Sequence, residues 1–213
     1  MSALELPPQE DSEATSRNIR LLAVPQPRTD GQLHLSGVQG EIDIIRNLAS
    51  SSPFVGFQEA DGTVEDVLSK MTQTDWIHFA CHGTQDRTNP FDSGFLLAHG
   101  RRLKLPDIAR VSRSHGGLAF LSACHTATGD EQLSEEAIHI AAGILLAGYR
   151  GAIATMWSND VPKVTEDVYK SLLGDGKVPD SRQAAGALHH AIERLRDSGA
   201  SFLSWVPFIH VGL

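Results

Sequence analysis

Trp76-Ile-His-Phe-Ala-Cys-His-Gly83 and Leu118-Ala-Phe-Leu-Ser-Ala-Cys-His125 share one construction: a short apolar run that is followed at once by cysteine and histidine. Short apolar runs of this kind are typical of strands that are buried on both faces of a parallel sheet. Consecutive strands are spatial neighbours in roughly two-thirds of cases, and open α/β sheets bind ligands beyond the carboxyl ends of their strands. We therefore expect the two strand ends to face a common crevice.

The rest of the chain repeats the alternation of short apolar runs with amphipathic segments, which predicts an α/β fold with helices on both faces of a mostly parallel six-stranded sheet. The predicted strands span residues 19–24, 54–57, 76–81, 118–123, 152–156 and 208–211. The predicted helices span residues 38–48, 64–71, 105–111, 135–146, 161–172 and 182–196, of which 135–146 is expected to be buried on most sides. A β-hairpin is predicted within residues 95–104, between the two quoted strands.

Composition limits the class of protein. The 213 residues are 41% hydrophobic and 21% charged, which fits one globular domain at 18–213 after a polar, proline-containing tail at 1–17 that we expect to be disordered. The net charge of −8 disfavours nucleic-acid partners, and apolar runs such as 138–146 are shorter than the ~18 residues of a membrane helix. Two cysteines are too few for a disulfide framework, and no leader is evident, so we expect a reducing compartment, the cytoplasm.

The two strand ends supply the parts of an acyl-transfer site. If the strands are neighbours, His82 lies beside Cys124 and can take the proton of the thiol during nucleophilic attack and later return it to a leaving amine. Gly83 lacks a Cβ, so a substrate can approach its backbone, and the N–H groups of Gly83 and Cys124 can bind the oxyanion of a tetrahedral intermediate. This chemistry requires no cofactor and no metal.

Several motifs in one order resemble the CHAT domain, a caspase-like module that is related to separase and the caspases. They lie between about Ile19 and Leu213: Glu41-Ile-Asp-Ile in the first helix, Ile77-His-Phe-Ala-Cys-His-Gly83, Phe95-Leu-Leu-Ala-His-Gly100, Leu121-Ser-Ala-Cys124, Leu145-Leu-Ala-Gly148, Met156-Trp-Ser-Asn-Asp160 and Trp205-Val-Pro-Phe-Ile-His-Val-Gly212. The order of these motifs is more specific than any one of them.

The resemblance implies a caspase-like three-layer sandwich and a cysteine endopeptidase whose dyad is Cys124 and His82. It implies protein or peptide substrates, and it suggests tetratricopeptide-like or other regulatory domains as partners in a longer protein. One segment departs from the family pattern: after the cysteine the family commonly has an acidic residue and Thr-Gly-x-Gly, whereas this chain has His125-Thr-Ala-Thr-Gly129. That difference affects the geometry of the loop and its specificity, and it leaves the dyad intact.

Three residues are candidates for contact with the substrate. The resemblance to separase suggests that Asp160 pairs with a basic side chain before the scissile bond, and Asp92, in the loop after His82, is a second candidate for that role. His125 adjoins Cys124 and can touch the substrate. For each aspartate, a solvated or helix-capping role is an equally good interpretation.

Two other kinds of function compete with a peptidase. Cys81, His82, Cys124 and His125 could form a zinc site, although ligands that are adjacent on an extended strand point to opposite faces, and closed zinc sites usually separate ligands by two to four residues. A caspase-like domain can also be a catalytically dormant module for interaction or signalling, and Ala127 in place of the first loop glycine fits such a relaxed site.

Overall fold

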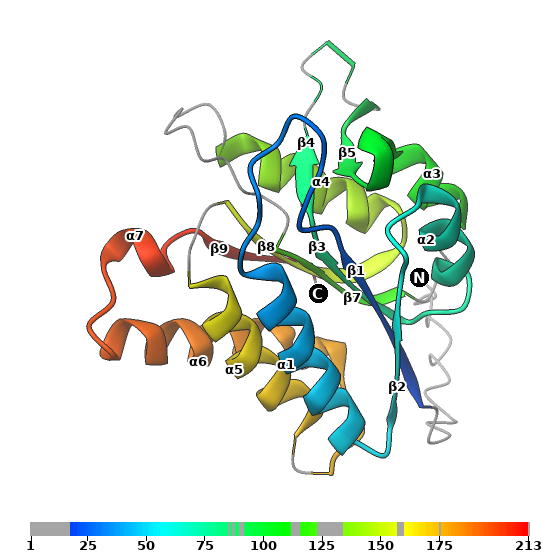
Figure 1. Cartoon of the computed structure of the whole chain (residues 1–213). Coiled ribbons are helices and arrows are strands. Elements are labelled where there is room, and N and C mark those ends of the chain that lie inside the picture. Colours follow the sequence, from blue (N-terminus) through cyan, green and yellow to red (C-terminus); the bar gives the residue numbers. More distant parts are fainter. Residues whose placement is uncertain are drawn as a thin grey trace, which may run out of the picture.

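A six-stranded sheet forms the centre of the protein, with strands in the order β2-β1-β3-β7-β8-β9 (Figure 1). The computed structural model describes residues 18–84, 86, 88–89, 92–111, 116–122, 134–156, 160–174 and 176–212, so the predicted tail at 1–17 lies outside the described residues. The strands are β1 (Ile19–Pro25), β2 (Val55–Glu59), β3 (Trp76–Ala80), β7 (Gly116–Leu121), β8 (Tyr149–Thr155) and β9 (Phe208–Gly212). The first five run parallel, and β9 pairs antiparallel with β8.

Helices cover both faces of this sheet and bury two separate apolar clusters against it (Figure 1). One face carries α1 (Val38–Ser51), α5 (Val161–Leu173) and α6 (Ala184–Asp197), and the other carries α2 (Val64–Met71), α3 (Leu105–Val111) and α4 (Ser134–Leu146). A short helix α7 (Phe202–Trp205) precedes β9, and single 3-10 turns span Ala98–Gly100 and Ser181–Gln183. The predicted three-layer α/β architecture is confirmed.

Local signals explain where several helices begin and end. The Thr63 hydroxyl accepts a hydrogen bond from the Asp66 backbone N–H at 3.3 Å and caps α2. Gly148, with φ of 101°, follows α4 in the left-handed conformation that glycine adopts readily. The prediction that this helix is buried on most sides was wrong. The side of α4 that carries Ile140 and Ile144 packs on the sheet, whereas Leu146 is 88% exposed.

A second, three-stranded antiparallel sheet contains the predicted hairpin and one strand that was not predicted. It consists of β4 (His82–Thr84), β5 (Gly94–Leu96) and β6 (Arg102–Lys104). A Cβ on Gly94 would lie 2.0 Å from the Leu103 carbonyl oxygen, so only glycine permits this close pairing of β5 with β6. Phe95 joins the two sheets, because its ring stacks on that of Phe79 in β3 with 3.9 Å between centroids.

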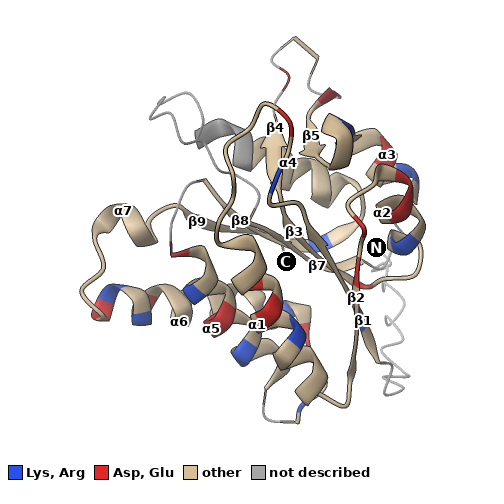
Figure 2. Cartoon of the chain, viewed as in Figure 1, with Lys and Arg blue, Asp and Glu red and all other residues tan. Residues whose placement is uncertain are grey.

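Charged residues lie mainly on the outer helices and loops, where acidic and basic side chains are interspersed, and the central strands carry few of them (Figure 2). Within the described part of the chain, no helix combines the length and the apolar composition that a membrane crossing requires.

Candidate active site

His82, the predicted base, begins β4 two residues after β3 ends, and it lies opposite Leu96 of β5. Its side chain is buried, and its Nε2 lies 2.8 Å from the backbone carbonyl oxygen of Leu33, in the loop between β1 and α1. A carbonyl oxygen can only accept a hydrogen bond, so Nε2 must carry a proton. In the neutral ring, Nδ1 is then the nitrogen with a free lone pair and is the basic atom.

Gly83 follows His82 in β4 and is half-buried opposite Phe95. The structure thus puts the two residues of the predicted histidine motif on the same short strand. That the Gly83 N–H binds an oxyanion stays a prediction.

The ends of β3 and β7 are adjacent, as the sequence predicted. The strands pair in parallel from Ile77 opposite Ala119 to Phe79 opposite Leu121. Beyond the last pair, the Ser122 N–H donates to the Phe79 carbonyl oxygen at 3.0 Å. Cys124 and His125 lie outside the described residues, in the gap at 123–133, so their predicted roles stay predictions.

A cluster of polar side chains that was not predicted from the sequence is buried directly behind these strand ends. Glu41 of α1 accepts hydrogen bonds from Ser122 at 3.0 Å and from Thr165 of α5 at 2.6 Å. His78 of β3 lies 3.1 Å from the same carboxylate, and its other ring nitrogen lies 3.2 Å from the Tyr169 hydroxyl. A glutamate on the apolar face of a helix was the signal that could have indicated the cluster.

The two candidate substrate-binding aspartates are already paired with lysines of the same chain. The Lys104 ammonium donates to Asp92 at 2.5 Å, and this hydrogen bond holds the pKa of the Asp92 carboxyl below its ordinary value. Asp160 lies at the N-cap position of α5, just after β8, and the hydrogen bond from Lys163 at 2.6 Å lowers the pKa of its carboxyl. The Lys163 side chain is 70% exposed, so a basic substrate side chain can displace it at little cost.

Cys81 and His82 have different surroundings, although they are neighbours in the sequence. Cys81 is fully buried in the apolar cluster between the sheet and the helices α2, α3 and α4, whereas the His82 ring contacts the loop between β1 and α1. In the described ranges, no three His, Cys, Asp or Glu side chains form a group that could hold a metal ion. Two members of the alternative zinc set, Cys124 and His125, lie outside those ranges.

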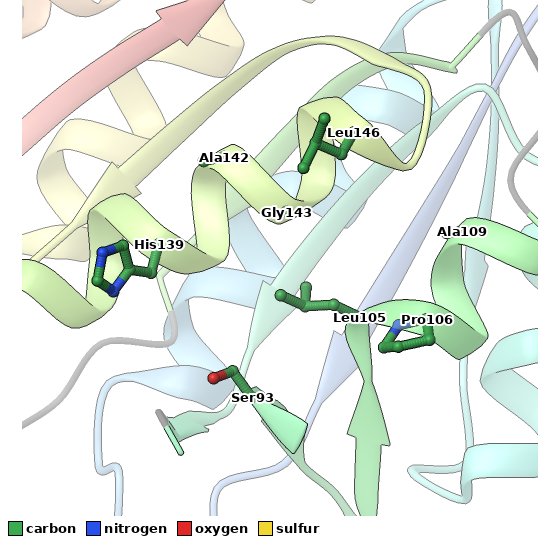
Figure 3. A pocket seen from close by; sticks show the side chains of 8 residues that line it. All are labelled: Ser93, Leu105, Pro106, Ala109, His139, Ala142, Gly143 and Leu146. Carbon is green, nitrogen blue, oxygen red and sulfur yellow. The ribbon is translucent and has the colours of Figure 1, made fainter. Parts of the chain in front are cut away.

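An apolar pocket of about 440 Å³ opens between α3 and α4 (Figure 3). The exposed side of α4, which includes Leu146, forms one wall. Of the predicted site residues that the structure describes, none lines it. Its lining residues are Ser93, Leu105, Pro106, Ala109, His139, Ala142, Gly143 and Leu146.

A family model described as the CHAT domain matches residues 2–213. No curated protein matched the chain at a significant level.

Proposed function

Because this chain belongs to the CHAT domain family, which is related to the caspase-like peptidases, we propose that it is a cysteine endopeptidase with Cys124 as nucleophile and His82 as general base. The hydrogen bond from His82 Nε2 to the Leu33 carbonyl carries this proposal, because it orients the ring and leaves Nδ1 as the basic atom. A backbone carbonyl thus orients this histidine as a carboxylate does in a catalytic triad, although it carries no negative charge.

The position of Ser122 supports the second half of the dyad. Ser122 is bonded to the end of β3, and the chain continues from it to Cys124 in two residues, which span at most about 7 Å. His82 follows the end of the same strand by two residues. The chain therefore keeps both residues of the proposed dyad, Cys124 and His82, close to the carboxyl end of β3.

The reaction uses these groups in two steps. His82 Nδ1 takes the proton of the Cys124 thiol while the sulfur attacks the scissile carbonyl carbon, and the carbonyl oxygen becomes an oxyanion that the Gly83 and Cys124 N–H groups bind. Collapse of the intermediate breaks the C–N bond as His82 returns the proton to the leaving amine. Water, deprotonated by His82, then hydrolyses the thioester and regenerates the thiol.

For substrate recognition we propose that Asp160 binds a basic side chain before the scissile bond. Asp160 follows β8, which lies beside β7, and its lysine partner is exposed at the surface. Asp92 is the second candidate, and its carboxylate accepts hydrogen bonds from Asn89 in the same loop and from Lys104 at the end of β6. His125 is proposed to contact the substrate next to the nucleophile.

Replacing Asp160 with Asn is expected to lower kcat/KM for a peptide with arginine before the scissile bond by about 10- to 100-fold, because a charge-assisted hydrogen bond contributes about 1.5–3 kcal/mol. The same peptide with norleucine in place of arginine should be cleaved equally by both proteins. Asp92→Asn is the matched control and should keep the preference for arginine. Loss of that preference in Asp92→Asn but not in Asp160→Asn would transfer the role to Asp92.

The dyad is tested without a known substrate by the rate at which iodoacetamide alkylates each cysteine near pH 7, measured by mass spectrometry. An adjacent imidazole lowers the pKa of a thiol, so Cys124 is expected to react at least about tenfold faster than in the His82→Gln variant. Glutamine keeps an amide that can donate to the Leu33 carbonyl and lacks a basic nitrogen. Buried Cys81 is an internal reference and should react slowly in both proteins.

Equal alkylation of Cys124 in the wild type and in His82→Gln would argue against the dyad. It would favour the alternative, a dormant module of the same fold that binds partners.

A further inference from the structure

Glu41 is an unusual residue for the interior, because its side chain is almost fully buried between α1, α5 and the strands β3 and β7. Burial of a carboxylate costs several kcal/mol unless donors surround it. Here Thr165 donates to one oxygen at 2.6 Å and Ser122 to the other at 3.0 Å. The two oxygens therefore bind different parts of the fold: one is hydrogen-bonded to the neighbouring helix α5, and the other to Ser122 at the end of β7.

Ser122 connects the carboxylate to both central strands. Its N–H donates to the Phe79 carbonyl of β3 at 3.0 Å, and its hydroxyl lies 3.2 Å from the same carbonyl and 3.0 Å from Glu41 Oε2. The hydroxyl has one proton, and the carboxylate is the stronger acceptor for it. Glu41 thus holds Ser122, the residue that directly follows β7 and lies two positions before Cys124 in the sequence.

His78 and Tyr169 complete the cluster on the side of α5. Burial, with a smaller contribution from the Glu41 carboxylate, raises the pKa of the Tyr169 hydroxyl well above its ordinary value, so this hydroxyl stays protonated and can donate to His78 Nδ1, 3.2 Å away. Nδ1 accepts such a hydrogen bond only when it carries no proton, so this arrangement puts the ring proton on Nε2, 3.1 Å from Glu41 Oε1. That contact lacks the directionality of a hydrogen bond, and we regard it as electrostatic.

Stability alone does not account for a buried polar cluster. Apolar residues of similar volume often replace a buried charged group with no loss of stability, or with a gain. What apolar residues cannot supply is a directional bond to the Ser122 hydroxyl. The cluster therefore indicates that Glu41 positions Ser122, and that stabilising the fold is not its only role.

We propose that Glu41 is a positioning residue: through its hydrogen bond to Ser122, it fixes the end of β7 against β3 and thereby holds Cys124 in place for His82. This inference rests on the proposed peptidase function and deepens it. Glu41 touches neither the substrate nor the reacting atoms in this scheme, so its effect must pass through Ser122.

The test measures the rate of Cys124 alkylation by iodoacetamide between pH 5 and pH 9 in Ser122→Ala, Glu41→Gln and the double variant. If Cys124 is displaced from His82, its thiolate is less stabilised and its pKa rises, so less thiolate is present near neutral pH and the reaction slows. We expect each single variant to react about three- to tenfold more slowly at pH 7, a range that corresponds to a rise of about half a unit to one unit in thiol pKa. The rates should converge with the wild type at pH 9.

In the double variant the two changes are expected to be non-additive, because both remove the same interaction. Its rate should match that of the slower single variant. Ser122→Ala is the smaller change and carries the test if Glu41→Gln does not fold.

Thr165→Val is the matched control. It removes the hydrogen bond to the other oxygen of Glu41 without a change at either strand, so it should lower the melting temperature and leave the alkylation profile within about twofold of the wild type. Equal slowing in Thr165→Val and Ser122→Ala would overturn the positioning role, because general loosening would then explain both.

Two further outcomes separate this inference from the proposed function. If His82→Gln slows alkylation but Ser122→Ala and Glu41→Gln keep the wild-type profile, the dyad stands and the positioning role is wrong. If the wild type reacts no faster than His82→Gln, the dyad and the positioning role both fail.

Discussion

Replacement of Cys124 with Ala is expected to abolish peptide cleavage, and replacement of His82 with Ala is expected to lower kcat/KM by about 10²- to 10⁴-fold. The first change removes the atom that forms the thioester, so no covalent route remains. The second leaves a thiol that must lose its proton without a base. The measurement is cleavage of a peptide library, followed by kinetics on the best peptide.

Cys81→Ala is the matched control for this experiment. Cys81 is the other cysteine of the chain, and its side chain is fully buried in the apolar core, whereas the His82 ring contacts the Leu33 carbonyl. The variant is expected to keep full activity once its folding is verified. Cleavage that persists in Cys124→Ala, or that disappears in folded Cys81→Ala, would contradict the assignment of the nucleophile.

Replacement of Phe95 with Ala is expected to lower the free energy of unfolding by about 3–5 kcal/mol. The Phe95 ring is fully buried and stacks on Phe79 at 3.9 Å, so its loss leaves a cavity between the small sheet and the central sheet. Domains of this size are stabilised by only about 5–15 kcal/mol, and the variant should therefore unfold at a clearly lower denaturant concentration. Urea unfolding, followed by circular dichroism, measures the change.

Phe95→Leu keeps most of the buried volume and is expected to cost about 1–2 kcal/mol. A loss below about 1 kcal/mol in Phe95→Ala would mean that the ring does not hold the two sheets together. Because β5 pairs directly with the strand of His82 and Gly83, the Ala variant should also slow alkylation of Cys124 under conditions where it remains folded.

Most of the fold could be predicted because its signals are local. Each of the six predicted strands is present in the sheet, and the helix predicted at 64–71 has the bounds of α2. The error at α4 has a physical reason: an apolar composition does not tell which side of a helix meets the sheet. Ile140 packs against the core, whereas Leu146 lines an open pocket.

The site could be predicted only in part. The sequence placed His82 and Gly83 after a central strand next to the strand that leads to Cys124, and the pairing of β3 with β7 confirms that adjacency. It did not indicate that His82 begins a new strand, β4, of a second sheet. That change of direction depends on pairing with β5, more than ten residues later, and no local pattern encodes it.

By itself, then, the amino-acid sequence determined the strands, the helices and the residue types at the strand ends, because hydrophobic periodicity and capping act over a few residues. Only the tertiary structure decided which groups meet. The Leu33 carbonyl lies 49 positions from His82, and Glu41 lies 81 positions from Ser122. A backbone carbonyl has no sequence signature, and a buried glutamate acquires its partners only when α1 packs on the sheet.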